Sequence, residues 1–374
     1  MSDSPVHVGL SGGVDSAVAA LRLREAGLPV VGVFMKNWEE DDQDGHCAAA
    51  EDLASARAVA DHLDIPLRTV NFSAEYWDRV FEHFLSEYRA GRTPNPDILC
   101  NSEIKFRAFL DFARAQGASG IATGHYARIE RRDGRCHLML SADPEKDQTY
   151  FLHRLDQDQL AASRFPLGDL TKAEVRRLAA SAGLPNAERR DSTGICFIGE
   201  RRFREFLARY LPASPGEMVT PEGEVVGEHQ GLMFYTIGQR QGLGIGGGHG
   251  SDNRPWYVAA KDLERNRLIV VQGGDHPLLH HPALALADLH WIGGRPPTGP
   301  LRCQARIRHR QPLQACVLIP SGHGWTVRFD RPQRAVAPGQ SAVFYRDGEC
   351  LGGGVIARAL TAATLPAGSM AHGT

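Results

Sequence analysis

The sequence predicts an α/β protein: a doubly wound parallel sheet, followed by a small central domain and a C-terminal β-barrel. Two observations carry this prediction. Up to about residue 125, short apolar runs alternate with segments whose apolar residues recur at helical spacing, which indicates βα units around a parallel sheet. The last stretch, from about residue 300, instead holds five short β-type runs separated by turn signals, which is typical of a small barrel.

The N-terminal elements are expected in a regular order. Strands are predicted at Val6–Leu10, Val30–Met35, Leu67–Phe72 and Gly120–Thr123. Apolar stripes predict helices that start near Val14, cover 56–63 and 77–88, and then span Ile104–Ala115. Because such sheets are covered on both faces, a ligand is expected at the C-terminal ends of the strands.

Beyond residue 150 the pattern changes twice. Residues 150–212 are expected to be largely helical, and Thr171 and Glu174 form a predicted capping box. Short strands and Gly-rich turns follow, and the barrel runs are 303–310, 314–320, 325–330, 341–345 and 350–356. We therefore expect an α/β domain at 1–200, a central domain at 201–275, a barrel at 276–360 and a tail at 361–374.

Composition narrows the class of protein. Lys plus Arg total 42 against 44 Asp plus Glu, a net charge of −2, and 42% of residues are hydrophobic, which suits a folded globular chain. The longest apolar run, 28–35, is far below the roughly 20 residues that span a bilayer, and no signal-peptide pattern is present. Seven cysteines at irregular spacings indicate reduced thiols. We expect a cytoplasmic protein without a membrane partner, in which any nucleic acid is held by local patches.

A glycine-rich segment, SGGVDS at residues 11–16, lies between the first predicted strand and the first helix. Two adjacent glycines let an anion approach the backbone N–H groups, and a helix N-terminus adds partial positive charge. The segment has neither the pattern nor the lysine of a Walker loop. It is therefore better suited to binding pyrophosphate than to γ-phosphoryl transfer.

Two cysteines lie in polar, turn-like settings. Cys100 follows TPNPDIL, whose two prolines stiffen the chain, so Asp97 and Cys100 are expected to project from a defined loop before the next helix. Cys196 lies in DSTGICFIG, also just before a helical stripe. A thiol at a helix N-terminus is biased toward the reactive thiolate. Spacing leaves open whether the two thiols meet, and an incidental buried thiol is the alternative for each.

The segments together resemble the bacterial tRNA-specific 2-thiouridylase family, within the PP-loop (HUP) ATP pyrophosphatase superfamily. The resemblance extends from about residue 6 to 356 and is carried, in order, by SGGVDS, FMKNWEEDD, AGRTPNPDILCN, ATGHYAR, KDQTYFL, DSTGICFIGERRFREFL, GEHQGLM, GQRQGLGIGG and PGQSAVFY. It departs from the family at His309, where an aromatic residue is usual. The resemblance implies ATP, Mg²⁺ and thiolation at C2 of the wobble uridine in tRNAs for Lys, Glu and Gln.

The resemblance also implies residue roles. Cys196 resembles the family's persulfide carrier, Cys100 the thiol that attacks or reduces the persulfide to leave a Cys100–Cys196 disulfide, and Asp97 the nearest acid or base. The implied ATP contacts are Gly9, Leu10, Ser11, Gly12, Gly13, Val14, Asp15, Ser16, Met35 and Gly124. Asp15 either supports Mg²⁺ or serves the loop itself. The implied tRNA contacts are Asn95, Pro96 and Asp97 at the target base, and His125, Lys146, Asp147, Gln148, Arg308, His309 and Gln340.

A basic run at 302–310 predicts where RNA would lie. As one β-strand it would put Arg302, Gln304, Arg306, Arg308 and Arg310 on one face, about 6.6 to 6.8 Å apart, as a ladder that can follow a phosphate backbone. A solvated strand face is the alternative. The implied partners are tRNA and a sulfur-relay persulfide donor or cysteine desulfurase, and a monomer is expected.

Other mechanisms and functions stay open at this stage. An iron–sulfur cluster held by Cys100, Cys196 and a third ligand such as Asp97 is a less favoured mechanism on the same residues, and no other protein-bound metal is expected. A PP-loop ligase that forms an amide from an adenylated carboxylate would need no paired cysteines. A non-catalytic tRNA-binding protein would have a decayed loop, whereas SGGVDS is intact.

Overall fold

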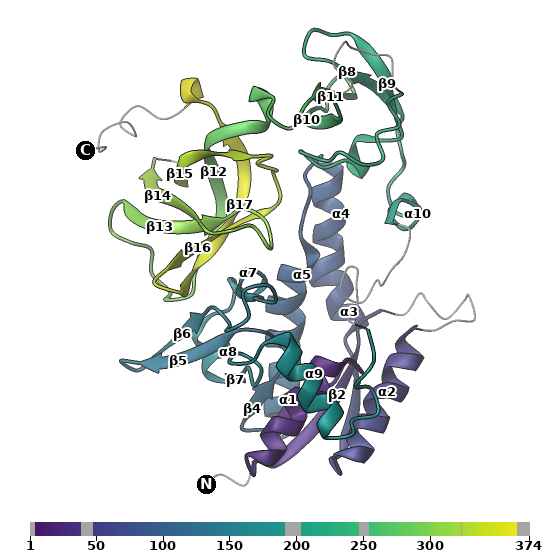
Figure 1. Ribbon diagram of the computed structural model, residues 1–374, viewed down its shortest axis with the longest axis vertical. Helices are drawn as coiled ribbons and strands as arrows, with labels where there is room; N and C mark the ends of the chain where they lie inside the picture. The colour runs from purple at the N-terminus through teal and green to yellow at the C-terminus, as the bar shows by residue number, and fades with distance from the viewer. Residues whose placement is uncertain (1–3, 39–47, 191–202, 247–253, 323, 365–374) are drawn as a thin grey trace.

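The computed structural model describes residues 4–38, 48–190, 203–246, 254–322 and 324–364. Its α/β part lies at one end of the long axis, and the barrel and the central domain lie toward the other end (Figure 1). The predicted fold class is confirmed, because a parallel sheet with helices is followed by a small second sheet and a closed barrel. No helix among the described residues combines the length and hydrophobicity that a transmembrane span requires.

The N-terminal sheet has five strands, and all its pairings are parallel. Its order is β3-β2-β1-β4-β7. The strands are β1 (Val6–Gly9), β2 (Val30–Lys36), β3 (Leu67–Asn71), β4 (Gly120–Ala122) and β7 (Ser163–Arg164). The order reverses between β1 and β4, and in doubly wound sheets ligands bind outside the carboxyl ends of the strands at such a switch point.

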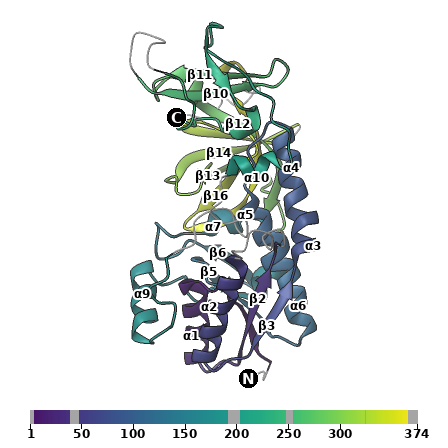
Figure 2. The same ribbon diagram turned by 90° about the vertical axis from the view of Figure 1, so that its right-hand side faces the viewer.

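Helices cover this sheet as the apolar stripes predicted. The α- and π-helical segments of the described chain, of which α4 and α10 lie away from the sheet (Figure 1), are α1 (Val14–Glu25), α2 (Ala48–His62), α3 (Ser73–Tyr76), η2 (Trp77–Phe81), α4 (Glu82–Arg89), α5 (Pro96–Leu99), η3 (Cys100–Ala108), α6 (Phe109–Ala115), α7 (Thr149–Leu152), α8 (Gln157–Ala161), α9 (Lys172–Ser181) and α10 (Phe203–Ala208). Helices α1 and α9 lie side by side (Figure 2), with their apolar faces in one core. The capping box of Thr171 and Glu174 at the start of α9 is confirmed.

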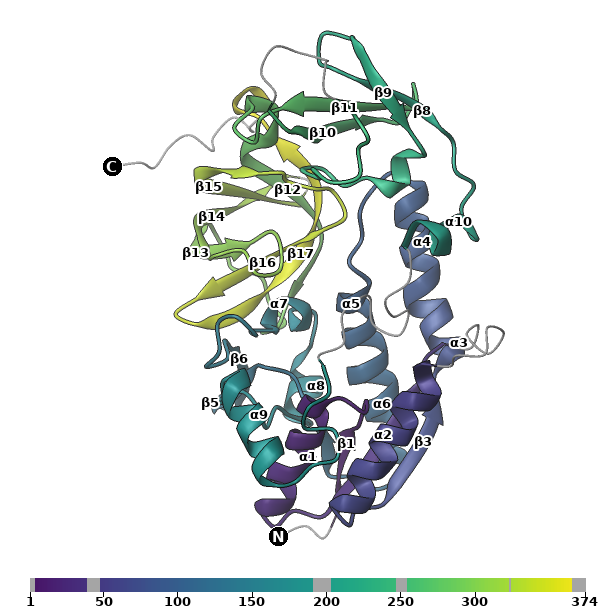
Figure 3. The ribbon, with the colours of Figure 1, turned by 45° about the vertical axis from the view of Figure 1, so that its right-hand side comes forward.

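Two helices run continuously through π-helical turns. The segments α3, η2 and α4 form one helix that rises from the sheet toward the central domain (Figure 3). The segments α5, η3 and α6 form another, which begins at Pro96 rather than at Ile104. The early start has a local cause: Asn95 caps the helix by accepting a hydrogen bond from Asp97 N at 3.1 Å, and proline suits the first helical position.

The central domain is a small four-stranded sheet of order β10-β11-β8-β9 with its own apolar core. Its strands are β8 (Gly216–Val219), β9 (Val225–His229), β10 (Trp256–Asp262) and β11 (Arg267–Gln272). It docks on the end of the rising helix, where Lys261 Nζ donates to the carbonyl oxygen of Gly91 at 2.9 Å. Burial lowers the pKa of Lys261 to about 8.

Six strands close the C-terminal barrel. They are β12 (His280–Trp291), β13 (Leu301–Arg306), β14 (Gln314–Ser321), β15 (Gly324–Arg334), β16 (Ser341–Arg346) and β17 (Glu349–Leu360). Pairing in the order β12-β15-β14-β13-β16-β17, with β17 returning to β12, completes the ring. Five of these strands were expected. Strand β12 was missed, and its register shifts between His281 and Ala283, where Pro282 removes a ladder donor.

The barrel is joined to the α/β part through a shared sheet. The hairpin β5 (Arg128–Arg132) and β6 (Arg135–Met139) extends the barrel sheet, because Leu138 pairs with Cys350 of β17. Tyr150 of α7 also donates to the carbonyl oxygen of Ser341 at 3.0 Å. These contacts set the position of the barrel above the carboxyl ends of the parallel strands (Figure 3).

Candidate active site

The N-terminus of α1 is an open anion site at the switch point of the sheet. Gly13 is the N-cap residue, and no side chain caps the helix. As at the start of any α-helix, the N–H groups of the first turn have no intrahelical acceptor, and the helix dipole adds partial positive charge at the same place. Together they form a ready site for a phosphate group.

The loop before α1 is anchored through one carbonyl group. The oxygen of Gly12 accepts hydrogen bonds from Ser55 Oγ at 2.8 Å, from Asn186 Nδ2 at 2.8 Å and from Arg189 at 3.2 Å. Gly12 has φ +79°, and a Cβ there would lie 2.5 Å from the carbonyl oxygen of Asp52. Only glycine fits, and the anchored carbonyl points to α2 and the segment after α9.

The predicted nucleotide residues lie together at this edge of the sheet. Ser16 Oγ donates to Gly13 O at 2.9 Å, and Ser11 N donates to Ser16 Oγ at 3.2 Å, so these serines shape the loop. Met35 is the last residue but one of β2 and lies over Gly9, where a Cβ would meet the Cε of Met35 at 3.1 Å. Direct contact of these residues with ATP stays a prediction.

Gly124 has a structural reason to be glycine besides its expected contact with ATP. Its contact with ATP stays a prediction, and a Cβ there would lie 2.7 Å from Asp15 C and 2.8 Å from Ser16 N. Gly124, two residues beyond β4, therefore has to be glycine because the start of α1 packs against it. This contact presses the phosphate loop onto the end of β4.

Asp15 is engaged by two side chains that the sequence did not indicate. Lys172 Nζ donates to Asp15 Oδ1 at 2.7 Å and to Oδ2 at 2.9 Å, and Tyr126 Oη donates to Oδ1 at 2.8 Å. The ammonium group of Lys172 therefore contacts both oxygens of this carboxylate, where a metal ion would otherwise bind. The arrangement does not fit Asp15 as a Mg²⁺ ligand, whereas it fits the alternative of a loop residue. The described residues hold no cluster of three or more His, Cys, Asp or Glu side chains for a metal ion.

Cys100 lies inside a helix and not in a loop before one, which corrects the prediction. It begins the π-helical segment η3, after the single turn α5, and its side chain is fully buried. Its backbone N–H bonds to carbonyl oxygens of that turn, so Cys100 does not meet an open helix N-terminus. Long π-helical segments are rare, and π-bulges are frequent at functional sites. Asp97 lies in the first turn of the same helix.

Cys196 lies outside the described residues, so its position relative to Cys100 is not part of this description. The barrel cysteines Cys303, Cys316 and Cys350 are buried, as is Cys136 on β6, which agrees with their interpretation as small apolar residues. Burial raises the pKa of Cys350 above its ordinary value. Cys100 is therefore the one predicted catalytic thiol that the described chain contains.

The expected ladder of basic residues is wrong beyond Arg306. Strand β13 ends there, because Ile307 N donates to Gln311 Oε1 at 2.9 Å and the chain turns through Arg310 with φ +66°. Arg306 itself is buried and paired with Asp147. Arg308 donates to the carbonyl oxygens of Ile237 and Ala335, and burial lowers its pKa. Only Arg302, Gln304 and Arg310 of the five are exposed.

Several predicted tRNA contacts have partners within the protein, and their contact with tRNA stays a prediction. His125 is buried, its Nδ1 lies 2.7 Å from Thr123 Oγ1, and burial lowers its pKa well below the ordinary value. Asp147 is also buried. His309 Nε2 lies 3.3 Å from Asp147 O, and Gln340 Nε2 donates to Thr93 O at 2.8 Å. Lys146 and Gln148 stay partly exposed.

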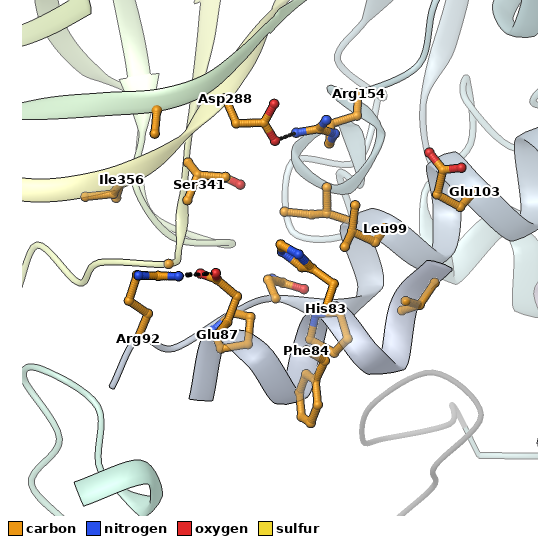
Figure 4. Close-up of a pocket in the computed structure, with 18 of the residues that line it drawn as sticks. His83, Phe84, Glu87, Arg92, Leu99, Glu103, Arg154, Asp288, Ser341 and Ile356 are labelled. Atoms are coloured by element: carbon orange, nitrogen blue, oxygen red, sulfur yellow. Dashed lines mark hydrogen bonds and ion pairs between the residues drawn. The ribbon is translucent and has the colours of Figure 1, made fainter. Parts of the chain in front are cut away.

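A cavity of about 620 Å³ lies between α4, the start of α5 and the barrel strands β12 and β17 (Figure 4). Arg154 and Asp288 form an ion pair at 2.6 Å at one side of it, and its apolar lining includes Leu99 and Ile356. Leu99 directly precedes Cys100. The helix that carries Cys100 therefore lines this cavity on the side that faces the barrel.

The uncapped helix at the switch point, held by a glycine loop, defines a nucleotide-binding α/β protein of the HUP class, here joined to two β-rich domains. Family models agree along nearly the whole chain. They match a tRNA methyl transferase HUP domain at 4–200, a tRNA methyl transferase PRC-barrel domain at 204–272 and an aminomethyltransferase β-barrel domain at 282–356.

Curated relatives narrow the class to a family. A tRNA-specific 2-thiouridylase MnmA of Alkalilimnicola ehrlichii is 64% identical over 94% of this chain and 96% of its own length. Chains of the same name from Chromohalobacter salexigens and Pseudomonas aeruginosa are each 59% identical over 94% of this chain, and over 92% and 94% of theirs. The chain belongs to the tRNA-specific 2-thiouridylase family.

Proposed function

We propose that this protein replaces the C2 oxygen of the wobble uridine of tRNA by sulfur at the expense of ATP. The observation that carries the proposal is the full-length similarity, at 59–64% identity, to chains named tRNA-specific 2-thiouridylase. The domain models bear the words methyl transferase, but the open anion site at α1 suits a reaction that consumes a nucleoside triphosphate. The two names predict different products, which makes the proposal testable.

The first step is adenylation of the base. The C2 carbonyl oxygen of uracil forms a bond to the α-phosphorus of ATP, and the bond from this phosphorus to the bridging oxygen breaks, so pyrophosphate leaves with the electron pair. The oxygen bound to C2 thereby becomes part of a good leaving group, AMP. The N–H groups at the start of α1 bind phosphate oxygens during this step.

The second step brings in sulfur. The terminal sulfur of a persulfide on Cys196 attacks C2 and displaces AMP, while the Cys100 thiolate attacks the Cys196 sulfur and breaks the S–S bond. A Cys100–Cys196 disulfide results, which an external thiol must reduce before the next cycle. The persulfide sulfur comes from a donor protein or a cysteine desulfurase. Because Cys100 is buried, its helical turn has to move, and the neighbouring cavity provides room.

The substrate base has to leave its stack to reach this site, as single-stranded anticodon loops allow. Asn95, Pro96 and Asp97 at the start of α5 are the proposed contacts of the flipped base. The partly exposed Lys146 and Gln148, together with exposed Arg310, are the proposed contacts of the adjoining RNA. A monomer in the cytoplasm suffices for this reaction.

The test is to incubate the protein with ATP, unmodified tRNA and a sulfide or persulfide source, and to identify the modified nucleoside by mass spectrometry. We expect a thiouridine that requires ATP. A methylated nucleoside, or an amide product formed with ammonia, would replace the proposal by one of the other functions. Cys100→Ser and Cys196→Ser should abolish transfer from a persulfide, whereas Cys136→Ser, a matched control at another buried thiol, should retain it.

A further inference from the structure

We propose that Asn101, the residue after Cys100, recognises the wobble base: its side-chain oxygen Oδ1 accepts a hydrogen bond from N3–H of uracil and thereby selects uridine over cytidine. The inference rests on the proposed thiolation of tRNA, and it names the group that recognises the base to be modified. Asn101 is the last residue of the segment AGRTPNPDILCN, and the sequence indicated no role for it.

The side chain of Asn101 is buried but only half paired. The residue is 3% exposed. Its amide nitrogen Nδ2 donates to the carbonyl oxygen of Phe151 in α7 at 3.5 Å, whereas Oδ1 has no hydrogen-bond partner among the residues that the structure describes. Buried polar atoms of native proteins are nearly always hydrogen-bonded. An acceptor left open at this place therefore calls for a donor from outside the described chain.

The orientation of this amide group is set by Phe151. A backbone carbonyl oxygen only accepts hydrogen bonds, so it faces the NH2 group of Asn101, and Oδ1 lies on the opposite side of the amide. Helix α7 packs against η3, and the ring centroid of Phe151 lies 4.4 Å from that of His309. The anchor of Asn101 is thus held by its own neighbours, and Oδ1 stays available to a ligand.

Asn101 lies in the part of the fold where the flipped base is expected. It directly follows Cys100, and Asp97, a proposed contact of the base, precedes it by four residues on the same face of the continuous helix. Helix α7, which anchors Asn101, also follows the proposed RNA contacts Lys146 and Gln148. Asn101 is buried as Cys100 is, so the base reaches both through the same movement of this helical turn.

The hydrogen-bonding pattern of uracil explains why an acceptor suits this place. In a uridine, N3–H is the only N–H group of the ring, and N3 is bonded to C2, the atom that receives sulfur. Cytosine has an unprotonated N3 at the same position, so its lone pair would face the lone pairs of Oδ1. A site built around a hydrogen bond rejects an analogue that lacks the donor, because the buried acceptor is then left unpaired.

The alternative is that Asn101 only joins η3 to α7 through Phe151. In that case its loss would lower stability and weaken the binding of every tRNA by the same factor. Recognition of N3–H instead predicts a loss that depends on the identity of the wobble base. The two roles are therefore separated by a ratio of affinities rather than by a single affinity.

The experiment measures binding of the full-length protein to three tRNAs that carry uridine, 3-methyluridine or cytidine at the wobble position and are otherwise identical. Fluorescence titration is carried out with an ATP analogue whose α,β-bridging oxygen is replaced by methylene, so adenylation does not occur. The two analogues of uridine share the absence of N3–H. We expect the wild type to bind the uridine tRNA about 10- to 100-fold more tightly than the other two, the effect of one hydrogen bond to a buried acceptor.

Asn101→Leu, which keeps the approximate shape but has no acceptor, should bind all three tRNAs within about twofold of one another. The matched control is Gln159→Met. Gln159 is also buried, and its Nε2 donates to Ser102 O at 3.1 Å, so it holds the same helix from α8. This variant should keep the wild-type preference for uridine. Asn101→Asp retains an acceptor and should keep the preference too, which guards against misfolding of Asn101→Leu.

Three results would overturn the inference: equal binding of the three tRNAs by the wild type, a preserved preference for uridine in Asn101→Leu, or loss of the preference in a folded Asn101→Asp. The proposed function is judged by a different readout, the formation of a thiouridine with ATP. A wild type that forms none would contradict the proposed function, whereas a wild type that forms thiouridine without preferring uridine in binding would contradict only the role of Asn101.

Discussion

Arg306 of β13 and Asp147 of the loop before α7 form an ion pair at 2.8 Å in which only 10% and 1% of their side chains stay exposed. The pair joins the barrel to the α/β domain. Thr149 Oγ1 also donates to Asp147 Oδ2 at 2.8 Å, and the Arg306 guanidinium lies over the ring of Tyr345. Both residues come from segments with an expected role in RNA binding, yet they serve the junction between domains.

Breaking this pair should destabilise the protein strongly. Arg306→Met leaves the buried carboxylate of Asp147 without its guanidinium partner, which typically costs about 3–5 kcal/mol. The matched control is Arg302→Met on the same strand, whose pair with Asp330 is exposed and should contribute less than about 1 kcal/mol. Urea unfolding measures both. Similar small changes in the free energy of unfolding would contradict the assigned role of the buried pair.

Gly12→Ala should abolish ATP binding. The new Cβ would lie 2.5 Å from the carbonyl oxygen of Asp52, so the loop has to shift and its N–H groups lose their arrangement. Gly117→Ala is the control, because Gly117 has a similar φ of +77° but open space around its Cβ position. It should cost about 1–2 kcal/mol of stability and leave ATP affinity unchanged. The ATP affinity of both variants is measured by calorimetric titration. Normal ATP binding by Gly12→Ala would show that this loop is not part of the ATP site.

Arg308→Ala and Arg310→Ala should separate stability from RNA binding. Arg308 donates to Ile237 O at 2.6 Å and to Ala335 O at 3.1 Å, so its loss should lower the melting temperature by loosening the central domain from the barrel. Arg310 is exposed, and its loss should reduce the salt dependence of tRNA binding by about one phosphate contact. Fluorescence titrations at several salt concentrations test this. If Arg308→Ala reduced the salt dependence of tRNA binding and Arg310→Ala lowered the melting temperature, Arg308 would be the RNA contact.

His153 should make the protein sensitive to acid. Burial lowers the pKa of His153 to about 3, whereas the unfolded chain has the ordinary value of 6.5. Between these values only the unfolded state takes up the proton, so stability is fully present above pH 6.5 and falls as the pH drops toward 3, by up to about 1.4 kcal/mol per pH unit.

The test variant is His153→Asn, which retains a donor for the carbonyl oxygen of Tyr150 but has no ionisable group. The free energy of unfolding is measured for both proteins across this pH range. The wild type should lose stability relative to the variant as the pH falls. Parallel curves would mean that His153 is not the acid-sensitive group.

The elements that the sequence predicted correctly have local causes. The strands β1, β2 and β4 are short, largely apolar runs, and the helix starts at Gly13 and Thr171 follow from a glycine loop and a capping box. Elements without such a pattern were missed: β7 has only two residues, and β12 contains Pro282. The predicted ladder failed because a side chain outside the run, Gln311, takes the N–H group that a longer strand would need.

The sequence alone was enough to locate the phosphate loop and the segment around Cys100 and to identify the family. Each of these is marked by a short motif of consecutive residues. It carried no sign that Lys172 reaches Asp15, that Asn186 and Arg189 hold Gly12, or that Arg306 is buried against Asp147. These pairings arise when α9 packs on α1 and the barrel closes over the sheet. Periodicity and turn chemistry act over a few residues, whereas partners far apart in the chain are selected by which surfaces become buried together.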